Sequence, residues 1–214
     1  TRFTPCPVLD MMARMNPAPA PLATRAAYAL AGLCACALLV AGATSPAHAQ
    51  AKDPGPVRNF EVTQKDDAYI ATIVMYTPAP LAVAWSVLTD FDNMSKFVPN
   101  VKESGVKARD GNTLTVEQKG TARFGLLSFP YTSVRRMELD PQKTILSTQV
   151  QGSMKKVVSL MRLSPEPSGT RLDYRIEIIP SGLASTVMSK DFLRNELTEQ
   201  FTAIVGEMGK RAKP

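Results

Sequence analysis

The chain is mildly basic and long enough for one domain with a sizeable core. Its 214 residues include 25 Lys and Arg against 19 Asp and Glu, which gives a formal net charge of +6 at pH 7. This charge favours transient contact with anionic membrane surfaces, but it does not require a nucleic-acid partner, and none is predicted.

The first 49 residues have the three parts of a secretory signal. Arg14 and Arg25 make a basic start, residues 26–43 form an unbroken apolar run, and Ala47 and Ala49 fill the small-residue positions of a cleavage site. We therefore expect cleavage of this signal peptide near Ala49 and a periplasmic or secreted mature chain.

The start of the chain leaves alternatives open. Because residue 1 is not Met, residues 1–10 are interpreted as an over-extended N-terminus ahead of a start at Met11, Met12 or Met15. An apolar run that is never cleaved would anchor the chain, since the run is long enough to span a bilayer. Acylation at Cys36 would instead make the chain a lipoprotein.

Cysteine and histidine all precede the expected cleavage. The sequence contains three Cys and one His, which are Cys6, Cys34, Cys36 and His48. The mature chain would therefore have no disulfide, no thiol nucleophile and no imidazole base, and zinc sites are built largely from Cys and His. We predict no metal site and no cofactor, and no catalytic residue is assigned.

Hydrophobic periodicity predicts one α+β domain over 60–211, after a flexible lead-in over 50–59. Residues 68–77 are β-branched and aromatic, as in a strand, and helical spacing follows Pro80. A second short helix is expected from Asn93 to Phe97. A period of two then predicts six further strands, over 101–108, 113–122, 131–140, 144–152, 155–166 and 170–179.

The last strand and the final helix indicate how the domain packs. Residues 170–179 alternate apolar and polar side chains, so one face of an antiparallel sheet would be buried. An apolar stripe runs along one long helix predicted over 184–211, the only predicted element able to cover that face. We expect a curved antiparallel sheet of about seven strands wrapped around this C-terminal helix, with two short helices after the first strand.

Three stretches of the chain resemble a known superfamily. They are "AWSVLTDFDNMSKFVPNVKES", "FPYTSVRRMELDPQKTI" and "RLDYRIEIIPSG", at 84–104, 129–145 and 171–182. In this order they resemble the START-like and Bet v 1-like helix-grip superfamily, in the branch of polyketide cyclases/dehydrases and coenzyme Q-binding proteins. The resemblance covers about 60–211. It implies a hydrophobic cavity between sheet and helix, often for a lipid, sterol, polyketide or quinone, but no universal catalytic set.

Asp90 and Asp92 lie two residues apart between the two short helices. As an acid–base pair in an enzyme, they would need surroundings that separate their pKa values. As helix caps, they would accept hydrogen bonds from free backbone N–H groups. Their position at helix ends favours capping.

The strand over 131–140 can face the expected cavity in two phases. If Met137 points inward, Arg135 does too, and a buried guanidinium must find a partner or a ligand anion. In the other phase Val134 points inward and Arg135 faces water, and Arg136 is the alternative inward candidate. The candidate ligand-binding residues are apolar, aromatic or anchoring side chains near the expected gap: Trp85, Phe97, Tyr131, Arg135, Met137, Met161, Tyr174, Met188 and Phe192.

These observations favour an exported, non-enzymatic binding protein whose partner is a hydrophobic small molecule such as a lipid, quinone or polyketide. The alternative is a polyketide cyclase/dehydrase-type enzyme that uses a carboxylate, a Tyr or an ordered water, because no His remains. A buried carboxylate or Lys that faces the cavity with a shifted pKa would separate the two. A partner-binding or toxin-like role is a third hypothesis, which the export signal disfavours.

Overall fold

The computed structural model describes residues 56–124 and 127–213, which belong to one compact unit, Ala49–Pro214. The predicted signal peptide lies outside the described residues and stays a prediction. None of the described helices combines the length and the apolar character needed to cross a membrane.

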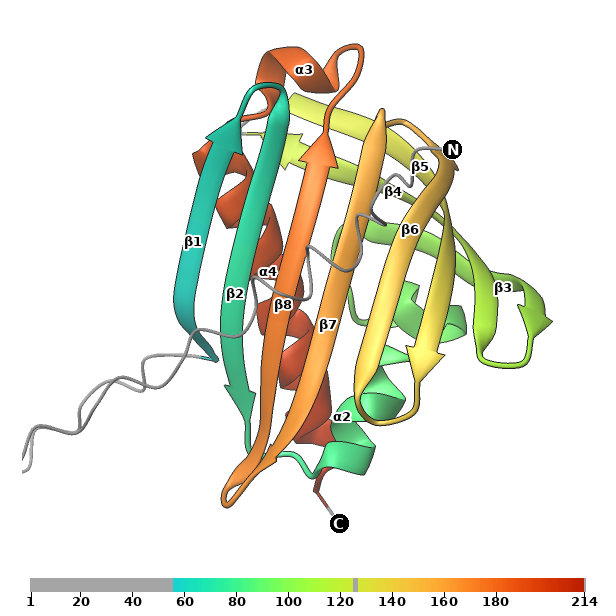
Figure 1. Cartoon of the computed structure of the whole chain (residues 1–214), viewed down its shortest axis with the longest axis vertical. Coiled ribbons are helices and arrows are strands. Elements are labelled where there is room, and N and C mark those ends of the chain that lie inside the picture. The colour runs from blue at the N-terminus through green and yellow to red at the C-terminus, as the bar shows by residue number, and fades with distance from the viewer. Residues whose placement is uncertain (1–55, 125–126, 214) are drawn as a thin grey trace, which may run out of the picture. The chain divides into compact units, whose positions relative to one another are not determined.

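Eight antiparallel strands of the described residues form one curved sheet, and α4 (Lys190–Arg211) lies across one of its faces (Figure 1). The order across the sheet is β1-β2-β8-β7-β6-β5-β4-β3, so β1 and β3 are the edges. The helix α2 (Leu81–Leu88) and the 3-10 helix η1 (Phe91–Lys96) follow β2. This arrangement confirms the predicted α+β helix-grip fold. The strands are β1 Val57–Lys65, β2 Ala68–Thr77, β3 Val101–Asp110, β4 Thr113–Phe124, β5 Leu127–Asp140, β6 Thr144–Gly152, β7 Lys156–Glu166 and β8 Gly169–Ile179.

The predicted count of about seven strands misses β1, which begins at Val57 inside the expected lead-in over 50–59. Along β1 only Val62 is buried, and the mostly polar neighbours give no clear alternation. Because β1 is an edge strand, its backbone pairing with β2 holds it in place with little buried surface of its own. The strand is therefore defined by its partner more than by its own side chains.

The single helix predicted over 184–211 is in fact two helices, α3 (Ala184–Val187) and α4. Between them Met188 has extended backbone, and its carbonyl accepts a hydrogen bond from the Tyr69 hydroxyl at 2.9 Å. Ser189 then caps α4, because its Oγ accepts a hydrogen bond from the Phe192 N–H at 3.1 Å. A tertiary contact and a cap thus interrupt a continuous helical pattern.

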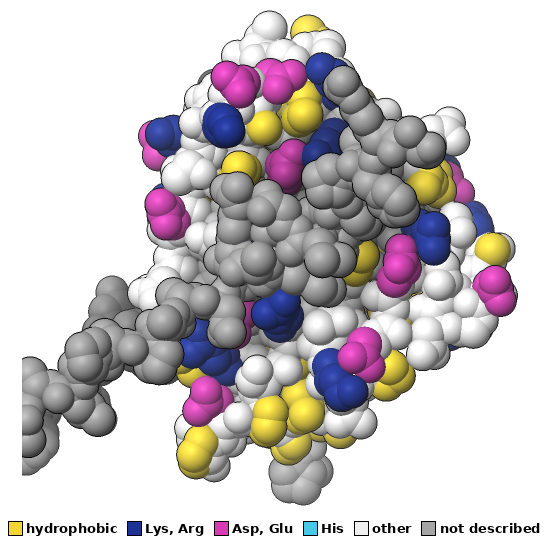
Figure 2. Space-filling view, viewed as in Figure 1, with side chains coloured by type: hydrophobic (Ala, Val, Ile, Leu, Met, Phe, Trp, Pro, Cys, Tyr) yellow, Lys and Arg dark blue, Asp and Glu magenta, His cyan; other side chains and the backbone are white. Residues whose placement is uncertain are grey.

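The face of the sheet opposite α4 carries paired charges. Lys156 Nζ lies 2.6 Å from Glu177 Oε1, and Arg171 Nη2 lies 2.8 Å from Asp173 Oδ1. Figure 2 shows basic and acidic side chains interspersed on the visible part of this side. Lys156 of β7 and Arg171 of β8 therefore belong to an ion-paired, partly solvated surface.

Tyr131 packs against a glycine of the neighbouring strand. Gly120 of β4 pairs with Tyr131 of β5, whose hydroxyl donates a hydrogen bond to the Asn100 carbonyl at 3.2 Å. A Cβ at Gly120 would lie only 2.0 Å from that carbonyl oxygen and 2.5 Å from the Tyr131 hydroxyl oxygen. The missing side chain therefore permits a close approach that positions Tyr131.

We expect Gly120→Ala to destabilise the protein, because the backbone must shift to accommodate the added methyl group. The free energy of unfolding should fall by about 1–3 kcal/mol, as at other overpacked sites. Urea unfolding followed by Trp85 fluorescence would measure this loss. Gly206→Ala on α4 is the matched control, since its added Cβ meets no neighbouring atom within 4 Å and should raise stability by roughly 0.5–1 kcal/mol. Equal stability of the two variants would contradict the close approach.

Candidate functional site

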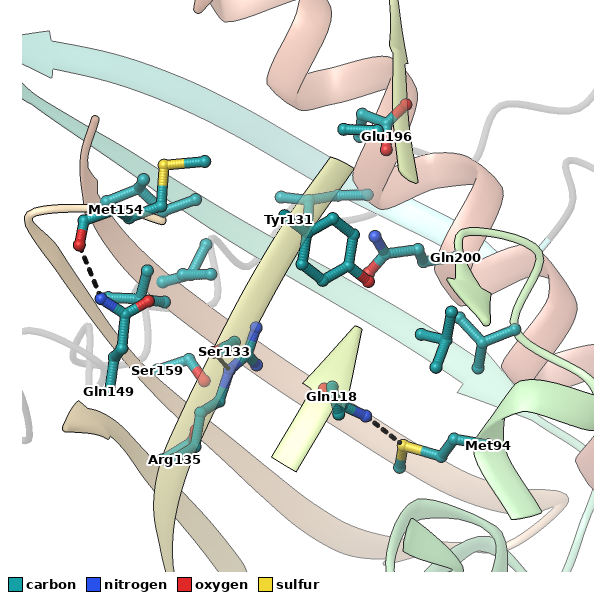
Figure 3. Close-up of a pocket in the computed structure, with 18 of the residues that line it drawn as sticks. Met94, Gln118, Tyr131, Ser133, Arg135, Gln149, Met154, Ser159, Glu196 and Gln200 are labelled. Carbon is teal, nitrogen blue, oxygen red and sulfur yellow. Dashed lines mark hydrogen bonds between the residues drawn. The ribbon is translucent and has the colours of Figure 1, made fainter. Parts of the chain in front are cut away.

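A cavity of about 230 Å3 lies between the sheet and α4. Its walls come mainly from β4 to β8 and α4, with a contribution from the segment around η1 (Figure 3). For comparison, a buried apolar cavity of roughly 150 Å3 already accepts benzene. The space is therefore large enough for an organic ligand.

Most of the cavity lining is apolar. Methionine and branched side chains on the strands face apolar and aromatic side chains on α4. The rings of Tyr174 and Phe201 meet edge to face, with centroids 4.7 Å apart. Such a surface favours an apolar ligand, because few hydrogen bonds to water would be lost when it is covered. The lining includes Met137, Ile145, Val157, Met161, Leu197 and Ile204.

The candidate ligand-binding residues separate into two groups. Those on the strands and around the start of α4 line the cavity, and their contact with a ligand stays a prediction. They are Tyr131, Arg135, Met137, Met161, Tyr174, Met188 and Phe192.

Trp85 and Phe97 do not line the cavity, contrary to the prediction. On α2 the buried side chains include Val87 and Leu88, so Trp85 lies on the flank of the buried stripe and is half-buried against the core. The ring of Phe97 lies beneath the Arg211 guanidinium, whose carbon is 5.4 Å from the ring centroid. Both aromatic side chains pack outside the cavity.

The strand β5 adopts the phase that turns Arg135 inward. Arg135 and Met137 line the cavity, whereas Arg136 is exposed and its Nε lies 3.4 Å from Glu138 Oε1. The Arg135 Nε donates a hydrogen bond to Ser133 Oγ at 2.9 Å. Figure 3 shows Arg135 and Ser133 on the same strand beside the cavity. A cation therefore lies in an otherwise largely apolar wall.

Two tyrosine phenols face the cavity. Burial raises the pKa of Tyr131, and the positive charge of Arg135 offsets only part of that rise. Burial also raises the pKa of Tyr174, against smaller opposing effects of Ser159 and Arg135. Both phenols therefore remain protonated at neutral pH. The Tyr131 O–H already donates to the Asn100 carbonyl, so its oxygen can accept a hydrogen bond from a ligand, whereas the Tyr174 O–H can donate one.

Glu196 was not predicted as a site residue, yet it lines the cavity and is 8% exposed. Its Oε1 accepts a hydrogen bond from the Arg123 N–H at 3.2 Å, and its Oε2 accepts one from the Asn100 amide. Burial, with a smaller contribution from Glu199, raises its pKa, although both hydrogen bonds oppose the rise. The sequence does contain a signal for this residue, because Glu196 is a charged side chain three positions after Leu193, within the apolar stripe of the helix.

Asp90 and Asp92 are neither cavity residues nor side-chain caps, so the capping prediction is wrong. Asp90 Oδ1 accepts a hydrogen bond from the Asn93 amide at 2.7 Å, and its Oδ2 lies 2.9 Å from Arg211 Nη1. These two partners, Asn93 first, lower the pKa of Asp90. Asp92 Oδ1 accepts a hydrogen bond from the Val106 N–H at 2.8 Å. The two carboxylates therefore connect the η1 segment to the end of α4 and to β3.

The described residues contain no group of three His, Cys, Asp or Glu side chains placed to hold a metal ion. The chemistry available in the described lining is that of one guanidinium, one carboxyl, two phenols, and uncharged hydroxyl and amide groups.

A curved sheet that encloses a cavity against its C-terminal helix is the helix-grip class of domain. The family model for polyketide cyclase / dehydrase and lipid transport matches residues 77–204, and the chain belongs to this family. No match to a curated protein was found.

Solved structures with a similar fold agree with this assignment. The Zhui aromatase/cyclase from Streptomyces sp. R1128 is 15% identical over 68% of this chain and 96% of its own, with a TM-score of 0.58. A STAR-related lipid transfer protein from Xanthomonas axonopodis is 11% identical over 71% of this chain and 99% of its own, with a TM-score of 0.54. A START superfamily protein from Mycobacterium smegmatis is 12% identical over 67% and 96%, with a TM-score of 0.53. These identities show a shared fold alone, and it is the family model together with this fold that confirms the predicted superfamily.

We expect Glu196 to make the protein less stable as pH rises. Its pKa in the folded state is raised above the ordinary value of 4.5, so the folded state binds more protons than the unfolded state. The free energy of unfolding should therefore decrease as pH rises from about 4.5 to the folded-state pKa, and stay lower above it. Glu196→Gln should flatten this slope, as measured by urea unfolding at several pH values.

The matched control for loss of one acidic side chain is Glu61→Gln, at an exposed position on β1. If wild type and Glu196→Gln show the same dependence of stability on pH, the pKa of Glu196 is not raised by its surroundings.

Proposed function

We propose that this protein is an exported binding protein that holds an apolar small molecule between its sheet and α4. The cavity carries this proposal, because largely apolar walls with a few polar groups are typical of sites for apolar ligands. The description of its family includes lipid transport, and one protein of similar fold is called a STAR-related lipid transfer protein. Export is supported by the signal-like composition of the first 49 residues.

Burial of apolar surface would drive binding. At ~25 cal/mol per Å2, a ligand that buries roughly 200 Å2 of apolar surface would gain about 5 kcal/mol before the cost of association is subtracted. Three of the polar side chains of the lining, Tyr131, Arg135 and Tyr174, would orient the ligand.

The helix α3 is the element best suited to move when a ligand enters. None of its residues is buried, and Gly182 just before it has a positive φ of 57°. Met188 and Phe192, just after it, line the cavity. A segment with so few buried contacts needs little free energy to open. Leu183 beside it is 74% exposed, which would suit transient contact with a membrane surface.

Native mass spectrometry of protein purified from the exported fraction of its own host would test the proposal. We expect a reproducible added mass that solvent extraction releases as a lipid, quinone or polyketide. Protein stripped in denaturant and refolded is the control, and it should take up the same mass from a lipid extract. A bare mass in both preparations would exclude the binding function.

Glu196 favours a second function, that of a cyclase or dehydrase. It is a buried carboxyl group that lines the cavity and has a raised pKa, the feature that distinguishes the enzyme from the binder. Such a group can take a proton from a carbon next to a carbonyl and give one to a departing hydroxyl, so that water leaves. The Zhui protein of similar fold is called an aromatase/cyclase.

If Glu196 performs this chemistry, ligand captured by Glu196→Gln should lose one water molecule when it is transferred to the wild-type protein. Mass spectrometry of the extracted ligand would detect the change. Glu61→Gln, at an exposed position on β1, is the matched control and should act as wild type does. An unchanged ligand mass would exclude dehydration and leave the binding function intact.

A further inference from the structure

We propose that the ligand of this cavity carries a carboxylate, which Arg135 and Ser147 bind at the wall formed by β5 and β6. This inference rests on the proposed binding function and specifies the chemistry of the ligand. Two independent observations carry it. Among the described residues, Arg135 in the cavity wall has no acidic partner, and the buried hydroxyl of Ser147 has no hydrogen-bond partner.

Arg135 is the cationic side chain of the described cavity lining. Its one hydrogen bond to a described residue is from Nε to Ser133 Oγ at 2.9 Å, and no described carboxylate lies within 4.0 Å of it. Some other arginines of the described chain pair with carboxylates, as Arg171 does with Asp173 at 2.8 Å. A guanidinium has five N–H donors in a planar fork that matches a carboxylate. Arg135 therefore has donors available on the cavity side of β5.

Ser147 of β6 supplies the second observation. The residue is 3% exposed, it lines the cavity, and its Oγ has no hydrogen-bond partner among the described residues. Buried hydroxyls are normally hydrogen-bonded, so one without a partner in a cavity wall indicates a position at which a polar ligand atom can form that hydrogen bond.

The pairing of β5 with β6 brings these two groups together. Arg135 pairs with Gln149, and Ser147, two residues before Gln149, pairs with Met137. Ser147 is therefore the diagonal cross-strand neighbour of Arg135, within reach of a long side chain. Ser147 also pairs with Ser159 of β7, which lines the same wall. Figure 3 shows Arg135, Gln149 and Ser159 around this part of the cavity.

The carboxyl group of Glu196 limits where a ligand anion can lie. It is held on the opposite wall by Asn100 and the Arg123 N–H. A ligand carboxylate beside Glu196 would meet a second acidic group, whereas one beside Arg135 would meet the one cation of the described cavity lining. The cavity therefore has an anion-binding wall at β5 and β6, and an apolar interior lined by Met137, Met161 and Phe201. This distribution fits a single-headed amphiphile.

Displacement of a neutral dye would test the inference. N-phenylnaphthylamine, which fluoresces in apolar sites, reports occupancy of the cavity without using a charge. Decanoic acid and decanol, which share one chain and differ in the head group, are then compared as competitors at a pH where the acid is ionised. We expect the acid to displace the dye at a concentration roughly tenfold lower than the alcohol, as for a charge-assisted hydrogen bond.

Variants assign the preference to the two residues. Arg135→Gln should abolish the difference between acid and alcohol while dye binding is retained, and Ser147→Ala should reduce it. Arg136→Gln, on the outward face of the same strand, is the matched control and should keep the wild-type preference. If Arg135→Gln fails to fold, Arg135→Lys tests the same point, because it keeps the charge but loses the planar fork and should weaken the preference.

The outcomes separate this inference from the binding function. If the dye does not bind the wild-type protein and neither competitor binds in a direct titration, the binding function itself fails. If the dye binds and the two competitors displace it equally, the cavity binds apolar molecules and the carboxylate inference alone is overturned. A preference for the acid that persists in Arg135→Gln and Ser147→Ala would also overturn it.

Discussion

A single long helix has to cover one face of an eight-stranded sheet, and the rest of the structure depends on this constraint. Neighbouring strands lie about 4.8 Å apart, so eight strands span roughly 34 Å, whereas a helix with its side chains is about 10–12 Å across. Among the strands, α4 contacts chiefly β1 and β2, and it also packs against α2. The inner surfaces of the middle strands lie farther from α4, and the curvature of the sheet leaves the cavity between them and the helix.

Sequence patterns predicted the elements that have one buried and one exposed face. Leu172 and Ile176 of β8 are buried between charged neighbours, so this strand and its inward face were correctly predicted. The strand β1 has no such alternation of buried and exposed side chains, and backbone pairing with β2 holds it at the sheet edge. The break before α4 depends on the Tyr69 hydroxyl, 119 positions from Met188, so no local pattern reveals it.

The site was predictable in part where residues share a strand face, and hidden where distant residues meet. The alternation of β5 places Arg135 and Met137 on one face, but the sequence left two phases open, and only the structure shows that this face lines the cavity. The buried carboxyl group of Glu196 accepts a hydrogen bond from Asn100, which lies 96 positions earlier in the chain. Its place in the cavity wall is therefore evident only in the folded structure. Asp90 and Asp92 show the converse, since they are neighbours in sequence that bind different elements.

The strand order has a consequence for how the chain folds during synthesis. The strand β2 lies between β1 and β8, and Tyr69 of β2 pairs with Ile178 of β8. The β1–β2 hairpin is synthesised first, but its pairing in the sheet is complete only after β8, the last strand, has been synthesised. Pairing between such distant segments slows folding, because a long loop has to close before any contact forms. A growing chain thus has an open sheet edge at β2 until β8 has left the ribosome. A chain interrupted before that point would keep the edge exposed, and exposed strand edges pair readily with other chains.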